Sequence, residues 1–84
     1  MDFILYGKSN CSLCEDAKQI LHLLQDEYVF HYREIDIYTD EKLVEKYHLS
    51  IPVLEYDGTI VDEGNIDYFK VQNFLQKKNF SENS

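Results

Sequence analysis

The sequence contains few of the residues that usually cross-link or interrupt a small protein. Among its 84 residues there are two cysteines, one proline, three glycines and no tryptophan. Two cysteines cannot supply the framework of a disulfide-rich secreted protein. A bond between Cys11 and Cys14 would close a loop so short that it stabilises the fold by only about 2 kcal/mol in the chain-entropy relation. We therefore expect the pair to serve chemistry rather than stability.

Long apolar runs are also absent. The run Phe3–Tyr6 is much shorter than the roughly 20 residues that a membrane-spanning helix needs. It follows Asp2, whereas a signal peptide begins with basic residues. No export signal is visible, so we expect a cytoplasmic protein without membrane contact.

Basic residues are scarce as well. Eight lysines and arginines stand against sixteen aspartates and glutamates, which gives a net charge of −8 and a pI near 4.6. Such a surface repels phosphate backbones and anionic lipids, so nucleic acid is not an expected partner. Seven tyrosines and five phenylalanines are enough for a hydrophobic core. We expect one domain over residues 1–78 and a flexible tail over 79–84.

The hydrophobic pattern alternates between strand and helix signals along the chain. It predicts strands at 3–6, 29–37, 53–56 and 59–61. It also predicts a helix from residue 12, a short helix carrying Leu43, Val44 and Tyr47, and a last helix after residue 65. The order is therefore β-α-β-α-β-β-α. The first β-α-β unit predicts a parallel pair and the later strands an antiparallel hairpin. An α/β fold follows, with a mixed four-stranded sheet flanked by helices.

Local signals predict where several elements begin. Ser12 and Glu15 fit a capping box for the first helix, with Asn10 as a competing cap. Thr39 or Asp40 can cap the short helix and Asn65 the last one. Between the last two strands, the dipeptide Asp-Gly at 57–58 is a strong hairpin signal.

The cysteine pair lies where the first strand passes into the first helix. At positions i and i+3 the two Cα atoms lie within about 6 Å, inside disulfide range. Cys11 is at the helix N-terminus, where the helix dipole favours a thiolate, so we expect it to be the nucleophile and Cys14 the resolving thiol. Lys8 would add to thiolate stability, whereas Glu15 and Asp16 would oppose it.

Two other interpretations of the cysteines are less specific. Both could be small buried side chains, but a Cys-x-x-Cys motif at a strand-to-helix junction favours redox chemistry. A structural zinc site needs four ligands, and His22, His31 and His48 lie on different predicted elements. We therefore expect no metal, and we expect all three histidines at the surface.

Three segments resemble the glutaredoxin family. Tyr6–Cys14 resembles its active-site segment, Ser50–Pro52 is similar to its Thr-Val-Pro segment, and Gly64–Asp67 is similar to its glycine-to-aspartate turn. The Cys-x-Leu-Cys motif and Glu34–Ile37 look closer still to a group of small, poorly characterised glutaredoxin-like proteins. The likeness covers nearly the whole predicted domain.

This resemblance implies a thioredoxin-like fold and thiol–disulfide exchange on glutathione mixed disulfides or protein disulfides. Glutathione would be a co-substrate, no cofactor would be bound, and the protein would be a monomer. Cys11 would attack, Cys14 would resolve, Lys8 would contact a glutathione carboxylate, and Ile51 would pair with the tripeptide through its backbone. The residues that the resemblance assigns to substrate binding are Lys8, Ile51, Pro52 (with a cis peptide bond), Gly64 and Asp67.

The sequence also departs from the family pattern. The motif lacks a proline after Cys11, Leu49 stands where many members have a basic residue, and Glu63 replaces a glycine before Gly64. Each change predicts weaker glutathione binding. Two alternative functions follow: an iron–sulfur cluster held between subunits by the same cysteines, or a redox-inactive protein-binding domain.

Overall fold

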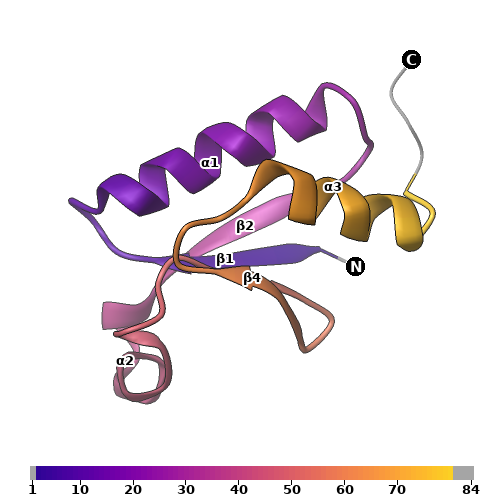
Figure 1. The fold of residues 1–84 in the computed structure, drawn as a ribbon. Helices are drawn as coiled ribbons and strands as arrows, with labels where there is room; N and C mark the ends of the chain where they lie inside the picture. The colour runs from indigo at the N-terminus through magenta and orange to yellow at the C-terminus, as the bar shows by residue number, and fades with distance from the viewer. Residues whose placement is uncertain (1, 81–84) are drawn as a thin grey trace.

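The molecule is built around a four-stranded sheet with α1 and α3 on one face and α2 on the other (Figure 1). The computed structural model describes residues 2–80. The elements are β1 (Phe3–Gly7), α1 (Ser12–Gln25), β2 (Tyr32–Asp36), a 3₁₀ turn (Ile37–Thr39), α2 (Glu41–Tyr47), β3 (Val53–Tyr56), β4 (Thr59–Glu63) and α3 (Tyr68–Lys77). The predicted order and the α/β class are thus confirmed. None of the helices within residues 2–80 is long and apolar enough to cross a membrane.

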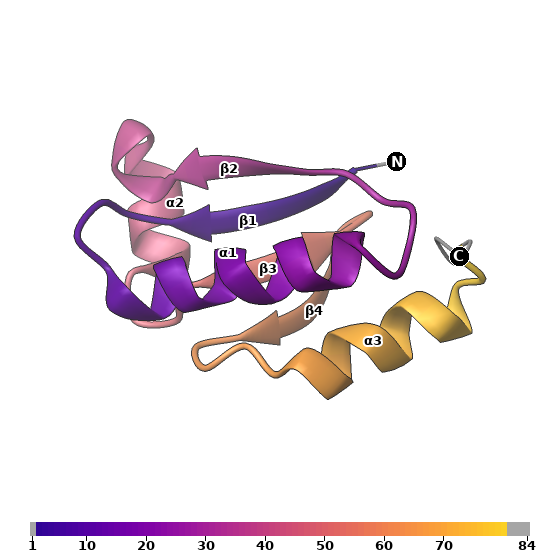
Figure 2. The same cartoon turned by 90° about the horizontal axis from the view of Figure 1, so that it is seen from above.

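The sheet is mixed and has the strand order β2-β1-β3-β4. β1 and β2 are parallel, whereas the β1–β3 and β3–β4 pairs are antiparallel. In this register Gly7 lies opposite Asp36, and Val53 lies between Tyr6 and Glu63. The ends of β1, β2 and β4 and the start of β3 therefore meet at one edge of the sheet, where α1 also begins (Figures 1 and 2).

The sheet divides the core into two parts. The face under α1 and α3 carries the larger cluster, which includes Phe3, Leu21, Leu54 and Leu75, all nearly inaccessible to solvent. The face under α2 carries a smaller cluster of Tyr6, Ile37, Tyr47 and Val53. Successive residues of a strand face opposite sides, so Phe3 and Leu5 contact one cluster and Ile4 and Tyr6 the other.

Both predicted boundaries of the second strand were wrong, while the first and fourth strands run one and two residues further than predicted. β2 begins at Tyr32 rather than at Val29, which is half exposed. It ends at Asp36 rather than at Ile37, because the Asp36 carboxylate accepts the Tyr38 N–H at 2.9 Å and starts a 3₁₀ turn. A short polar side chain that bonds the backbone two residues on competes with the strand ladder.

The helix caps also differ from the prediction at two of three sites. Cys11 caps α1 instead of Ser12 or Asn10, and Asn10 has a φ of 53°, outside the extended region that an N-cap needs. Asp67 caps α3 in place of Asn65 and accepts the Phe69 N–H at 3.1 Å. The cap of α2 is Asp40, one of the two predicted candidates.

The β3–β4 hairpin turns at Asp57 and Gly58, as predicted. Their φ angles of 49° and 80° are both positive, as a type I′ turn requires. Packing also continues beyond residue 78, because Phe80 lies 5.5 Å from the Phe3 ring and donates its N–H to Leu75 O. Of the expected tail over 79–84, residues 81–84 lie outside the described part of the chain.

Candidate functional site

The two cysteines form a disulfide at the start of α1. Their Cα atoms are 5.2 Å apart, which agrees with the distance expected from their spacing. Cys11 is half-buried, whereas Cys14 is only 3% exposed. An incoming molecule can therefore reach the Cys11 sulfur more easily than the Cys14 sulfur.

Cys11 is also the N-cap of α1. Its Sγ accepts the Cys14 N–H at 3.2 Å, and its carbonyl accepts the Glu15 N–H at 3.1 Å. The sulfur thus lies at the positive end of the helix dipole, next to a backbone donor. Both interactions favour a thiolate on Cys11 when the disulfide is reduced.

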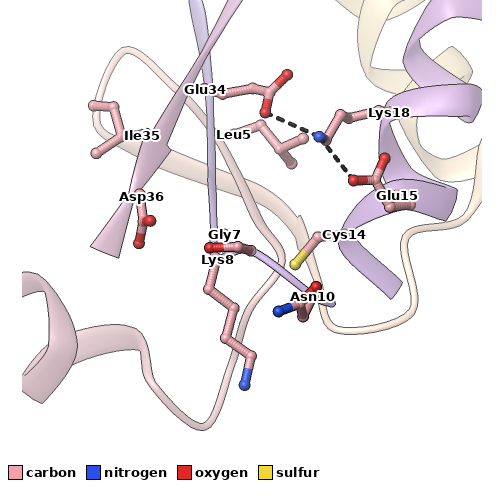
Figure 3. Close-up of a pocket in the computed structure, with 11 residues that line it drawn as sticks. Leu5, Gly7, Lys8, Asn10, Cys14, Glu15, Lys18, Glu34, Ile35 and Asp36 are labelled. Carbon is pink, nitrogen blue, oxygen red and sulfur yellow. Dashed lines mark hydrogen bonds and ion pairs between the residues drawn. The ribbon is translucent and has the colours of Figure 1, made fainter. Parts of the chain in front are cut away.

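Gly7 makes room for the second sulfur. A Cβ atom placed on Gly7 would lie 3.1 Å from Cys14 Sγ, closer than most side-chain contacts. Figure 3 shows the Cys14 sulfur directed towards this residue. The sequence marked Gly7 only as the end of a strand, so its role against Cys14 was missed. The motif alone gives no signal for it.

The segment before β3 adjoins the turn before α3. The Ile51–Pro52 peptide bond is cis, as the resemblance implies, and Pro52 is fully buried. Gly64 N–H points to the carbonyls of Ser50 at 3.1 Å and Pro52 at 2.8 Å. The structure therefore brings together three of the predicted substrate residues, Ile51, Pro52 and Gly64.

Several backbone donors of these segments already have partners within the chain. The Ile51 N–H donates to Tyr47 O at 3.1 Å, so only the Ile51 carbonyl remains for a substrate. The Asp67 N–H donates to a carboxylate oxygen of Asp62 at 2.9 Å. Asp62 is 8% exposed and was not singled out from the sequence.

The two charged residues predicted to bind substrate, Lys8 and Asp67, differ in whether their side chains have partners within the chain. Lys8 is exposed in the loop between β1 and α1, and within residues 2–80 its ammonium makes neither a hydrogen bond nor an ion pair. Asp67 uses its carboxylate to cap α3. Lys8 is therefore available to a ligand, whereas the Asp67 side chain already has a structural partner.

A cavity of about 340 Å³ opens on the flank of Cys14, between α1 and β2 (Figure 3). Of the predicted substrate residues only Lys8 lines it. Its other charged lining residues are Glu15, Lys18, Glu34 and Asp36. Sequence reasoning gave no site role to the last three, although the i, i+3 spacing of Glu15 and Lys18 could have indicated their ion pair.

Lys18 links the helix to the sheet across this cavity. Its ammonium lies 3.1 Å from Glu15 and 3.2 Å from Glu34. The hydrogen bond to Glu15, followed by that to Glu34, raises the pKa of Lys18 above its ordinary value. Lys18 is thus held as a cation between two carboxylates and is not free to bind an anion.

Metal binding has little support in the described residues. Within residues 2–80, no three His, Cys, Asp or Glu side chains are arranged to hold a metal ion. The histidines are exposed, as predicted. The Tyr32 hydroxyl lies 3.0 Å from His22 Nε2, and His48 Nδ1 lies 2.8 Å from Val44 O.

The family can now be assigned. A family model described as a glutaredoxin-like domain (DUF836) matches residues 2–76, which is most of the chain. The protein belongs to this glutaredoxin-like family. The predicted resemblance is thereby confirmed, and the disulfide lies within the matched region of the glutaredoxin-like chain.

Solved structures show the same fold for this glutaredoxin-like protein. A Northeast Structural Genomics target protein from X. campestris is 23% identical, with a TM-score of 0.77 over 89% of this chain and 96% of that chain. Protein Ne2328 from Nitrosomonas europaea is 25% identical, with a TM-score of 0.76 over 87% of this chain and 88% of that chain. Thioredoxin 1 from Thermosipho africanus TCF52B is 12% identical, with a TM-score of 0.55 over 94% and 99%. The fold is thioredoxin-like.

Proposed function

We propose that this glutaredoxin-like protein is a thiol–disulfide oxidoreductase, with Cys11 as the nucleophile and Cys14 as the resolving thiol. The observation that carries the proposal is the unequal placement of the two sulfurs. Cys11 is the N-cap of α1 and is half-buried, whereas Cys14 lies one turn inside and is buried. The Cys11 sulfur can thus react with a substrate disulfide, whereas the Cys14 sulfur can react only with the neighbouring Cys11 sulfur.

The reaction begins from the reduced pair. The Cys11 thiolate attacks one sulfur of a substrate disulfide, forming a mixed disulfide and releasing the other sulfur as a thiolate that takes up a proton. Cys14 then loses its proton and attacks Cys11 Sγ. This step forms the Cys11–Cys14 disulfide and releases the second substrate thiol. Two thiols of an external reductant, a low-molecular-weight thiol or a protein dithiol, restore the reduced pair and are oxidised to a disulfide.

The chain's own residues support the first step. The Cys14 N–H and the dipole of α1 stabilise negative charge on Cys11, and Lys8 on the preceding loop adds a positive charge. The Ile51 carbonyl and the segment around Pro52 form the expected docking edge for the substrate chain. We expect the protein to act as a monomer in the cytoplasm, with glutathione or a disulfide-containing protein as partner.

Single-cysteine variants test this assignment. Cys11→Ser should abolish reduction of both a glutathione mixed disulfide and a protein disulfide. Cys14→Ser should stop protein-disulfide reduction but retain a single-thiol reaction with the glutathione mixed disulfide. Rates are measured with purified protein and a coupled reductase assay. Activity of Cys11→Ser equal to that of the unmodified protein would show that the proposed function is wrong.

A further inference from the structure

Asp62 is a buried carboxylate that holds the turn before α3. One oxygen accepts the Glu63 N–H and the other accepts the Asp67 N–H, both at 2.9 Å. The Lys70 ammonium lies 3.5 Å away but is largely exposed. The carboxylate therefore occupies the Asp67 N–H, in the Gly64–Asp67 turn that the glutaredoxin resemblance assigns to substrate binding, and the N–H of Glu63 just before that turn.

Other donors of the same region are occupied too. The Phe69 N–H is bound by the Asp67 carboxylate, and the Gly64 N–H by the carbonyls of Ser50 and Pro52. A substrate carboxylate that sought the N–H group of Glu63, Asp67 or Phe69 would have to displace a carboxylate of the protein itself. Because two close carboxylates repel each other, binding an anion here is unfavourable.

Two acidic side chains without an ion pair in the described part of the chain lie at the edge of the sheet where α1 begins. Asp36 and Glu63 lie at the ends of β2 and β4, on the edge of the sheet where α1 begins (Figure 2). Both side chains are exposed, and within the described residues neither forms an ion pair. Lys18 and Lys70 are paired with acidic side chains, whereas Lys8 forms no ion pair within residues 2–80.

We propose that Asp62 and Glu63 make the site select disulfides in basic polypeptide segments over glutathione. This inference rests on the proposed function and names its substrate class. Glutathione carries more carboxylates than amines, so it meets both the occupied donors of the turn and the negative edge. A polypeptide needs no carboxylate partner, and its basic side chains can reach the acidic groups at the edge of the sheet where α1 begins.

The cavity beside Cys14 fits this substrate class. Its volume of about 340 Å³ accommodates a long side chain, and Glu15, Glu34 and Asp36 outnumber the lysines in its lining (Figure 3). The Lys8 side chain extends away from Glu34 in Figure 3. A basic residue close to the substrate cysteine would find carboxylates in the cavity while its disulfide meets Cys11.

The test compares disulfide probes of opposite charge with the reduced wild-type protein. Two peptides carry the same intramolecular disulfide, flanked by arginines in one and by glutamates in the other, and a glutathionylated peptide is the third probe. At low salt we expect the arginine peptide to react at least about tenfold faster than the glutamate peptide, since opposite charges speed encounter. The ratio should shrink as salt screens the charges.

Variants then separate the two residues. Asp62→Asn frees a backbone donor and removes a charge, so we expect KM for the glutathionylated peptide to fall at least about threefold with kcat unchanged. Glu63→Lys changes only an exposed side chain and should reduce the preference for the arginine peptide over the glutamate peptide, even if Asp62→Asn fails to fold. Glu45→Lys, on the exposed side of α2, is the matched control and should leave the preference as it is.

The outcomes are distinct. Equal rates with all three probes, independent of salt, would overturn the inference and leave the proposed function standing. No reaction of the wild-type protein with any probe would instead overturn the proposed function. A small cationic disulfide, cystamine, reacting as fast as the arginine peptide would overturn the assignment to polypeptides.

Discussion

At the level of single residues, the two cysteines differ because of what surrounds them. Cys11 Sγ accepts the Cys14 N–H at the start of α1, whereas Cys14 lies on the buried face of α1 and packs against Gly7. Burial of a sulfur slows its reaction with external molecules but leaves it free to attack a neighbouring sulfur. These surroundings support the proposed order of attack, in which Cys11 reacts first and Cys14 second.

Replacing Gly7 by alanine should disturb Cys14 directly. The new Cβ would lie 3.1 Å from Cys14 Sγ, so the sulfur or the strand has to move. We expect a loss of about 1–3 kcal/mol in the free energy of unfolding, as for other overpacked sites. Urea denaturation of the reduced protein measures it.

A double-variant cycle identifies the cause of that loss. Cys14→Ala removes the sulfur, so Gly7→Ala should cost much less in the Cys14→Ala protein than in the wild type. An equal cost in both backgrounds would show that the alanine strains the β1 backbone instead.

Some residues of the site could be found from the sequence and others could not. Cys11, Cys14, Lys8 and Pro52 belong to short motifs whose meaning is local. Asp62 was missed because a β-bulge between Leu54 and Glu55 shifts the register, so that Asp62 faces Leu54 over the larger core cluster while Ile60 lies opposite Glu55 on the other face. A simple alternation along β4 would put both residues on one face.

At the level of elements, the turn between β3 and β4 needs glycine at position 58 for its positive φ and not for lack of space around the residue. Gly58 has a φ of 80°, and a Cβ there would meet no other atom within 4 Å. Gly58→Ala should therefore lower the free energy of unfolding by about 1 kcal/mol through conformational strain alone.

The matched variant for this hairpin is Gly58→Asn. Asparagine tolerates positive φ better than alanine, so its loss should be smaller. Thermal or urea unfolding of both variants provides the measurement. A larger loss for asparagine than for alanine would show that the turn does not depend on φ.

Element order was predictable because hydrophobic periodicity extends over whole segments. The caps of α1 and α3 were not, since residues 10–12 and 65–67 each offer more than one side chain that can accept a backbone N–H. For α3 the choice falls to Asp67, whose own N–H is fixed by Asp62. The hydrogen bond between Asp62 and Asp67 spans a turn, so it does not follow the helix or strand periodicity from which elements are predicted.

At the level of the whole molecule, several ionisable groups favour the fold below pH 10. Burial, and then the charge of Glu55, raises the pKa of Tyr6. Burial, and then the charge of Glu34, raises the pKa of Tyr32. The hydrogen bond to Glu27, and then burial, raises the pKa of Tyr68. Each phenol therefore keeps its proton to higher pH in the folded chain than in the unfolded chain.

Stability should accordingly fall in alkaline solution. Above pH 10.0, the ordinary tyrosine value, the unfolded chain binds fewer protons than the folded one, so the free energy of unfolding decreases as pH rises. Lys18 acts in the same direction, because its raised pKa gives stability below 10.5 that is lost as pH rises through the folded value.

Urea titrations of the oxidised protein between about pH 8 and 11 measure this decline. Tyr6→Phe should reduce it, whereas Tyr38→Phe, at an exposed tyrosine, should leave it as in the wild type. A denaturation midpoint that stays constant up to pH 11 would contradict the prediction.

The division of the core by the sheet has a consequence for motion. α2 has only seven residues and packs on the smaller core cluster. We therefore expect α2 to unfold locally before the helices α1 and α3 on the other face of the sheet do. The N–H groups of Ser50 and Ile51 are bonded to Tyr47 O at the end of this helix. Local opening of α2 would release them together, and amide exchange in 41–51 should then outpace that of β1. The docking edge could in this way reshape itself around different polypeptides without unfolding the domain.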